Sequence, residues 1–329
     1  MLFEQDVRCL LACSFDLKTF LTSFNQLVLQ RGRGLVLAVP WFWLLLFFAV
    51  PFLILLRISV TDMGEGLDPF APLVHMDAGR ATLHLKLANY LSLLIDPESG
   101  WGETLYIESY GLSLKYALWT TVLSLLLGYP FAYFLARSSP KIRPLLLLMV
   151  MLPFWTSFLL RVYAWKGLLA DQGLINNLMI FVGLVNEPIQ LIYNDVSMLI
   201  GMTYVYLPFM VLPLYANLVK LDDRLLEAAQ DLGATPWKSF WMITVPLSRS
   251  GIVAGSILVF IPCLGEFVIP SLLGGAENLM IGRVVWDEMF SSNNWPRASA
   301  LAVVMIVGIV MPLAWYNQRL ARKVEQELS

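Results

Sequence analysis

The sequence predicts an all-α, polytopic membrane protein with six transmembrane helices. Of its 329 residues, 58% are hydrophobic and only 14% are charged, whereas an average soluble domain has roughly 25% charged residues. Six segments are apolar over about 20 residues, the length that a helix needs to cross the hydrocarbon core. The large core of a soluble protein does not account for six such segments in one chain.

The predicted membrane domain covers residues 35–318, between an N-terminal segment (1–34) and a C-terminal tail (319–329). The first span lacks the small-residue site of a cleaved signal peptide, so we expect an uncleaved anchor. Residues 172–186 are uncharged but too short to span, which suits an interfacial or re-entrant helix. The six spans are predicted at 35–57, 115–136, 144–166, 196–219, 251–276 and 298–318.

The distribution of Lys and Arg predicts the orientation of these spans. If both termini are cytoplasmic, the inner segments hold 14 Lys and Arg and the outer segments hold 4. The loop 137–143 contains three cations and no acid. Basic residues concentrate in cytoplasmic loops, so we expect a bacterial inner-membrane protein with both termini in the cytoplasm.

The loop at residues 220–250 predicts two short helices outside the membrane. Asp222 or Asp223 can cap the first helix, and Gly233 can end it. Thr235 followed by Pro236 is typical of a helix start, and Pro246 is expected to end that second helix. Both helices carry apolar side chains that the loop alone cannot bury, which favours docking onto a partner.

Within this loop, Glu227-Ala228-Ala229, Gly233 and Ile243-Thr244-Val245-Pro246 resemble the EAA signature of ABC-importer permeases. That pattern is EAA, three residues, G, nine residues, I, one residue, L, P, and Val245 replaces the usual Leu. The resemblance implies a type I ABC importer permease fold. It also implies that the loop docks into an ATPase subunit, with Glu227 facing the ATPase and Gly233 permitting the close turn. The alternative is a helical hairpin that only lies on the membrane.

The chain itself lacks the phosphate-binding loop of an ATPase, because it contains no Gly-Lys dipeptide. We therefore expect a transport subunit that is not an enzyme and binds no cofactor. ATP and Mg would be bound by the partner ATPase. With a net charge of −2 the chain also shows no bias towards nucleic acid, and three Cys and two His without a CxxC predict no metal site.

Further stretches resemble polyamine permeases in particular. They are Leu152–Phe158, Tyr206–Pro213 and Gly265–Pro270, with Leu127–Pro130 and Met280–Arg283. The long segment after the first span is closer to the putrescine branch than to the spermidine branch. The resemblance implies a second homologous permease, two ATPase subunits, a periplasmic polyamine-binding protein and a lipid bilayer as partners.

Glu266 is the one acid inside a predicted span. An intramembrane charge is costly and is by default a candidate for function. Polyamines are cations, so carboxylates and aromatic faces suit their path. The predicted substrate pathway contains Glu266, Arg161, Trp155, Tyr204 and Tyr206. An internal ion pair between Glu266 and Arg161 is the alternative, and each aromatic residue can instead serve in packing.

Asp287 and Glu288 lie on an amphipathic segment, 280–290, that we expect to contact the binding protein. Three other functions stay open. An ABC permease for spermidine, ferric iron or thiamine would share the same signature. A secondary transporter would be expected to show inverted repeats and several intramembrane charges, and a membrane enzyme would need a catalytic cluster that this chain lacks.

Overall fold

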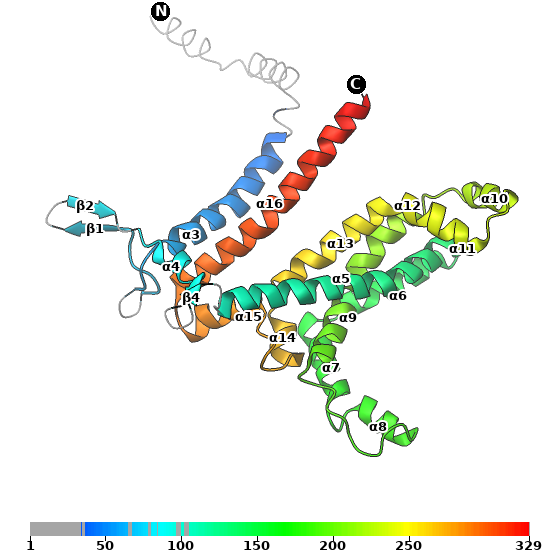
Figure 1. Ribbon diagram of the computed structural model, residues 1–329, viewed down its shortest axis with the longest axis horizontal. Helices are drawn as coiled ribbons and strands as arrows, with labels where there is room; N and C mark the ends of the chain where they lie inside the picture. The colour runs from blue at the N-terminus through cyan, green and yellow to red at the C-terminus, as the bar shows by residue number, and fades with distance from the viewer. Residues whose placement is uncertain are drawn as a thin grey trace, which may run out of the picture. The chain divides into compact units, whose positions relative to one another are not determined.

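The computed structural model describes residues 34, 37–64, 68–77, 80–83, 85–96, 100–101 and 105–328 (Figure 1). The chain divides into two units, Met1–Arg57 and Ile58–Ser329. In the described residues, four helices are long and apolar enough to cross a membrane, and up to six spans result if each of two bent helix pairs counts as one. The predicted N-terminal segment lies outside the described residues, apart from Gly34.

The first candidate span is the helix Leu37–Ser59. It contains a π-helical turn, η1 (Leu45–Ala49), followed by α3 (Val50–Ser59). Pro51 stands directly after this turn and has no N–H to donate to the helix, which is a known cause of local helix irregularity. None of the residues in the most apolar window of this helix is buried, as expected of a helix whose solvent is lipid.

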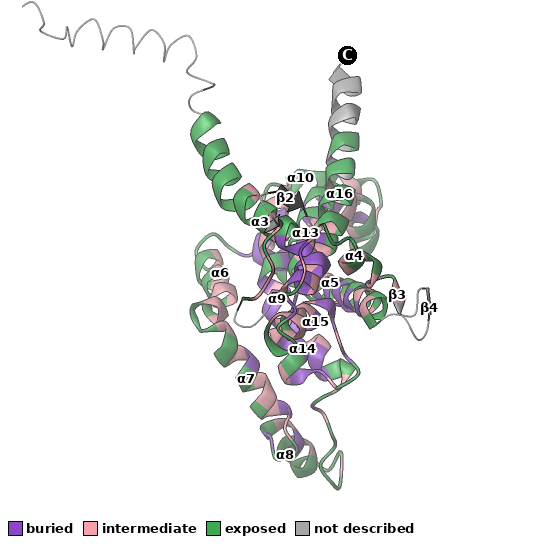
Figure 2. Ribbon diagram, turned by 90° about the vertical axis from the view of Figure 1, so that its left-hand side faces the viewer, coloured by how far each residue is buried: buried purple, intermediate pink, exposed green. Residues whose placement is uncertain are grey.

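The core of the second unit consists of three helices packed against one another. They are α5 (Leu105–Arg137), α9 (Asp195–Leu218) and α13 (Arg249–Leu264). Figure 2 shows that buried residues gather along them. Met210, Leu214 and Val259 are fully buried in this cluster. Helix α5 begins at Leu105, ten residues before the predicted start of the second span.

Small residues allow α13 to approach α9 closely. A Cβ atom on Gly251 would lie 2.8 Å from Cβ of Asn217, and one on Gly255 would lie 2.7 Å from Sδ of Met210. Without hydrophobic driving force inside a membrane, such close packing of backbones is a main source of helix association. The GxxxG spacing of these two glycines therefore serves packing.

The prediction of one continuous third span at 144–166 is wrong. Helix α6 (Arg143–Met151) tightens into a 3₁₀ turn, η2 (Leu152–Trp155), and α7 (Phe158–Leu169) follows after a break. The two parts are bent by 89°. Thr156 is extended, with ψ 152°, and Pro153 lacks the N–H that a continuing α-helix needs. Helix α8 (Leu174–Phe181) then forms within the uncharged stretch 172–186.

The fifth predicted span, 251–276, is broken as well. Helix α13 ends at Leu264, and α14 (Val268–Leu273) starts after a non-helical segment at 265–267. The chain then reaches α15 (Ile281–Trp286), a π-helical turn η4 (Asp287–Ser291) and the long helix α16 (Trp295–Leu328). Helix α16 extends ten residues beyond the predicted sixth span and through most of the predicted tail.

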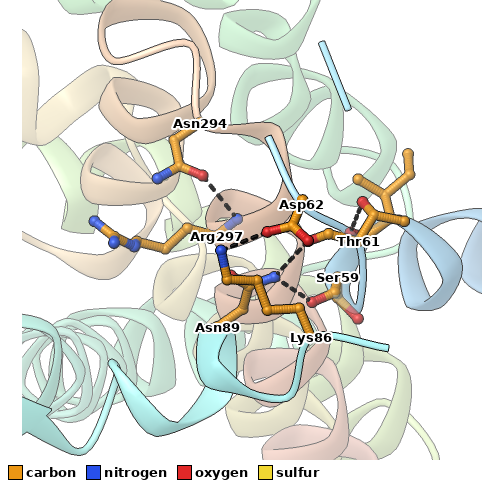
Figure 3. A network of polar contacts seen from close by, with 8 residues as sticks. Ser59, Thr61, Asp62, Lys86, Asn89, Asn294 and Arg297 are labelled. Carbon is orange, nitrogen blue, oxygen red and sulfur yellow. Dashed lines mark hydrogen bonds and ion pairs between the residues drawn. The ribbon is translucent and has the colours of Figure 1, made fainter. Parts of the chain in front are cut away.

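Two small antiparallel sheets lie in the loop between α3 and α5. They are β1 (Val74–Asp77) with β2 (Arg80–Leu83) and β3 (Ile95–Asp96) with β4 (Gly100–Trp101), on either side of α4 (Ala88–Leu91). Asn89 Nδ2 donates hydrogen bonds to the carbonyls of Ser59 (3.0 Å) and Thr61 (2.8 Å), and Lys86 pairs with Asp62 (Figure 3). These contacts hold α4 against the chain that leaves α3.

The close approach of α13 to α9 yields a testable prediction. Gly255→Leu should lower the thermal stability of the purified permease complex in detergent by about 1–3 kcal/mol, because the added atoms overpack a filled contact. Gly308→Leu is the matched control, since a Cβ atom on Gly308 of α16 meets nothing within 4 Å. Equal melting temperatures for the two variants would contradict the assignment.

Candidate coupling and translocation sites

The predicted two-helix loop is formed by α10 (Arg224–Asp231), α11 (Pro236–Ser239), a π-helical turn η3 (Phe240–Thr244) and α12 (Val245–Leu247). Both aspartates at its start have a role. Asp222 Oδ1 accepts a hydrogen bond from the N–H of Arg224 at 3.0 Å, and Asp223 forms an ion pair with Arg137. Because Arg137 is the last residue of α5, this pair ties the start of the loop to the core.

Gly233 ends α10 in the left-handed conformation, with φ +82°. Its N–H donates to the carbonyl of Gln230 at 2.8 Å, and the N–H of Ala234 donates to the carbonyl of Ala229 at 3.0 Å. These two bonds form a Schellman motif, in which glycine avoids the steric cost of a positive φ. The predicted glycine turn is confirmed, and its cause is the backbone conformation rather than a crowded neighbour.

The second helix of the loop starts as predicted and ends differently. Thr235 Oγ1 accepts a hydrogen bond from the N–H of Lys238 at 3.3 Å, and Pro236 takes the first helical position. The expectation that Pro246 ends this helix is wrong, because the helix continues to Leu247. The π-helical turn η3 directly before Pro246 changes the local bonding pattern, and such turns accommodate a residue that lacks an N–H.

Phe240 anchors the loop to α5. Its ring makes edge-to-face contacts with Tyr129 at 5.5 Å and with Tyr133 at 5.8 Å. The hydroxyl of Tyr129 is also hydrogen-bonded to Oγ of Ser248, at 2.8 Å. Edge-to-face pairs add stability beyond the area that they bury, so the second helix and α5 should move together.

The rest of the loop presents an apolar surface. Leu232 is 89% exposed, Trp237 71% and Met242 66%. Of the signature residues, Glu227, Ala228 and Gly233 are exposed, whereas Ala229, Ile243 and Pro246 are half-buried. One side of the signature is thus available to another chain, and the other side supports the hairpin.

Glu266 lies in the break of the fifth span and caps the helix that follows it. Its Oε1 accepts hydrogen bonds from the N–H groups of Phe267 (3.2 Å), Val268 (3.0 Å) and Ile269 (3.4 Å). The first N–H groups of a helix have no partner within it. A carboxylate at this position satisfies them and interacts favourably with the helix dipole.

The other oxygen of Glu266, Oε2, accepts a hydrogen bond of 2.5 Å from the hydroxyl of Tyr206. The residue is 8% exposed. The structure therefore brings together two of the predicted pathway residues, from α9 and from the break after α13. The sequence signal for the break was the pair of prolines, Pro262 and Pro270, that flank this acid.

No ion pair joins Arg161 to Glu266 among the described residues, so the predicted alternative of an internal pair is not formed here. Three rings separate the two charges. The guanidinium of Arg161 lies 5.0 Å from the ring of Phe154, which contacts Phe209 at 5.2 Å. Phe209 in turn lies 6.1 Å from Tyr206, the partner of Glu266.

Arg161 faces a cavity of about 390 Å³ that Trp165 and Tyr204 also line. The rings of these two residues are in contact at 5.5 Å. Arg161 Nε is buried and has no hydrogen-bond partner in the described chain. Trp155, at the break of the third span, is 76% exposed and does not line this cavity. Of the predicted pathway residues, Arg161 and Tyr204 are thus grouped, and Trp155 stands apart.

Asp287 and Glu288 differ in their surroundings. Glu288 accepts a hydrogen bond from the hydroxyl of Tyr106 at 2.6 Å and pairs with Arg297 at 4.0 Å, and its side chain is 15% exposed. Asp287 pairs with Arg283 within the same helical segment and is 49% exposed. Sequence reasoning missed Tyr106 and Arg297, which carry no pattern of their own. The contact of this segment with a binding protein stays a prediction.

A bundle of apolar, partly broken helices with a protruding helical hairpin defines a membrane transport subunit. A family model described as "Binding-protein-dependent transport system inner membrane component" matches residues 124–326, more than half of the chain. The chain belongs to this family.

Relatives over nearly the whole length carry transport names. The chain is 36% identical over 306 residues to the spermidine/putrescine transport system permease protein PotB of Haemophilus influenzae, covering 92% of this chain and 100% of the relative. It is 38% identical over 288 residues to PotB of Escherichia coli K12, covering 87% and 98%. It is also 35% identical over 220 residues to the inner membrane ABC transporter permease protein YdcU of that organism, covering 63% and 69%.

A solved structure shows the same fold. A chain of a bacterial ABC transporter involved in the import of the acidic polysaccharide alginate matches 91% of this chain and 99% of its own length, with a TM-score of 0.60 and 17% identity. At that identity the likeness concerns the fold alone. Together with the family match, it confirms the predicted ABC permease fold.

The hydrogen bond between Tyr206 and Glu266 yields a second prediction. Tyr206→Phe should destabilise the permease by about 1.5–3 kcal/mol, the usual contribution of a hydrogen bond to a charged group. Tyr204→Phe is the control, because the contact shown for Tyr204 is through its ring. Thermal unfolding of both variants, followed in detergent, provides the measurement, and equal stabilities would argue against a structural role for the bond.

Proposed function

We propose that this chain is a permease subunit of an ATP-driven importer of polyamines, and that it forms half of the translocation pore with a homologous second permease. A periplasmic binding protein delivers the substrate, and two ATPase subunits bind ATP and Mg. The observation that carries this proposal is the hairpin α10–α12. It is fixed to α5 by Phe240 and by the Arg137–Asp223 pair, yet it leaves an apolar surface and Glu227 open to another chain.

The geometry supports a mechanical link from this hairpin to the pore. Helix α13 follows the hairpin directly, at a bend of 65°, and ends at the break that holds Glu266. The hairpin lies at the opposite end of the bundle from α14 and α15 (Figure 1). A displacement of the hairpin by the ATPase would therefore shift α5 and α13 together. Such a shift can favour one of two pore states without any covalent chemistry in this chain.

The charges along the pathway suit a cationic substrate. Glu266 can attract an ammonium group, and the rings between it and Arg161 offer cation–π faces. Arg161 repels a cation and would mark the far limit of the favourable region. Orientation follows from the basic loops: we place both termini in the cytoplasm and α10–α12 on the same side.

Putrescine is our proposed substrate, from the likeness of the first interhelical loop to the putrescine branch. The relatives are named for both spermidine and putrescine and do not select one. Uptake of radiolabelled putrescine and spermidine by cells that express the full transporter distinguishes the two. Uptake of ferric iron or thiamine in place of either polyamine would favour the alternative solutes.

Glu266→Gln should reduce polyamine uptake at least tenfold while the complex still assembles. The amide oxygen of Gln can continue to accept hydrogen bonds from the N–H groups that start α14, so the change removes the charge and keeps the cap. Glu277→Gln is the matched control, because Glu277 is exposed in the nearby loop. Wild-type uptake by Glu266→Gln, with normal amounts of complex in the membrane, would refute the pathway assignment.

Glu227→Lys should weaken binding of the ATPase subunits by at least about tenfold, or 1.4 kcal/mol, because it reverses a charge on the exposed side of the hairpin. Co-purification and ATPase activity of the reconstituted complex measure this loss. Glu187→Lys makes the same reversal at an exposed acid away from the hairpin. If both variants retain the ATPase equally, the hairpin is not the docking element.

A further inference from the structure

The start of α15 packs directly onto the break that holds Glu266. A Cβ atom on Gly282 would lie 2.4 Å from the carbonyl oxygen of Gly265 and 2.7 Å from that of Glu266. Both distances are far below van der Waals contact, and the neighbours are backbone atoms that cannot rotate away. The glycine therefore lets α15 rest against the main chain at the point where the fifth span opens, with no slack between them.

Helix α15 is itself fixed by α5. Oγ of Ser113 accepts a hydrogen bond from the N–H of Ile281 at 2.7 Å, and the hydroxyl of Tyr116 donates to Asn278 at 2.8 Å. Ile281 and Val284 are buried in a separate small cluster with residues of α16. The helix is thus a rigid piece between the core and the break.

A second contact joins the same two elements through side chains. The ring of Phe267, the residue after Glu266, stacks on the indole of Trp286 with centroids 4.7 Å apart and planes 10° from parallel. Trp286 then contacts Phe290 at 4.3 Å. Gly282 and Trp286 lie at a spacing of four residues, on one face of α15, so backbone and ring contacts act from the same side of the helix.

The other end of this segment reaches solvent. In η4, Glu288 is tied to Tyr106 and Arg297, whereas Phe290 is 56% exposed and the side chain of Asp287 is 49% exposed. Contacts made at the exposed part of η4 can therefore move α15. Because α15 and the break have no free space between them, that movement must reach residues 265–267.

We propose that α15 and η4 form a strut that sets the position of the Glu266 carboxylate, with Gly282 and Trp286 as positioning residues. When a substrate-loaded binding protein engages η4, the strut shifts the break and with it the cap of α14 and the Tyr206 bond. Glu266 becomes available to substrate only when the binding protein is docked. This inference rests on the proposed function and adds to it the route from the docking face to the pathway.

The test uses the complete transporter in proteoliposomes, with and without binding protein loaded with putrescine or spermidine. Gly282→Ala forces α15 away from the break. We expect the stimulation of ATPase activity by loaded binding protein to fall about tenfold, within the 5- to 150-fold range of typical coupling between sites. Basal ATPase activity should persist, since the hairpin α10–α12 lies at the other end of the bundle. Gly111→Ala is the control, because its Cβ would meet nothing within 4 Å.

Two further variants keep the test decisive if Gly282→Ala does not assemble. Trp286→Ala removes the stack on Phe267 at a residue that is 44% exposed, whereas Trp286→Phe keeps an aromatic partner. Loss of stimulation in the first and its rescue in the second support the strut. A merely structural role would lower basal and stimulated rates alike.

The strut is refuted if Gly282→Ala and Trp286→Ala keep wild-type stimulation, or if basal and stimulated activity fall in proportion. A failure of the proposed function has a different signature. In that case the unmodified transporter itself shows neither stimulation by loaded binding protein nor uptake of either polyamine.

Discussion

Three backbone N–H groups at the start of α14 have no partner within their own helix, and the carboxylate of Glu266 accepts hydrogen bonds from all of them. A buried N–H group without a partner costs about 1–3 kcal/mol, so the break in the fifth span depends on this one side chain. The same carboxylate receives the hydroxyl of Tyr206 from α9. One acid therefore both permits the break and joins it to the core of the bundle.

Around this acid the bundle is rigid where it must transmit movement and open where it must bind. Glycines bring α13 onto α9 and α15 onto the break, and aromatic contacts join the hairpin to α5. Packed contacts of this kind change between discrete arrangements rather than deforming gradually. The exposed surfaces lie at the two ends of the assembly, on the hairpin and on η4.

The separation of Arg161 from Glu266 by three aromatic rings has a physical consequence. A direct pair would neutralise both charges and leave little for a substrate to bind. With Phe154, Phe209 and Tyr206 between them, the carboxylate keeps its bonds to N–H and O–H donors, and the guanidinium rests on rings. A diffusing cation thus meets an attractive region with a defined limit.

The sequence by itself determined the class of the protein, because hydrophobic length, the bias of Lys and Arg, and the spacing from Glu227 to Pro246 are local features. It also determined the Gly233 turn and the Thr235 cap, which depend on neighbouring residues only. The tertiary structure alone decided that two predicted spans are broken, that Arg161 does not meet Glu266, and that Glu288 pairs with Tyr106 and Arg297. These outcomes depend on which distant helices pack together, and a run of apolar residues has the same composition whether its helix is straight or broken.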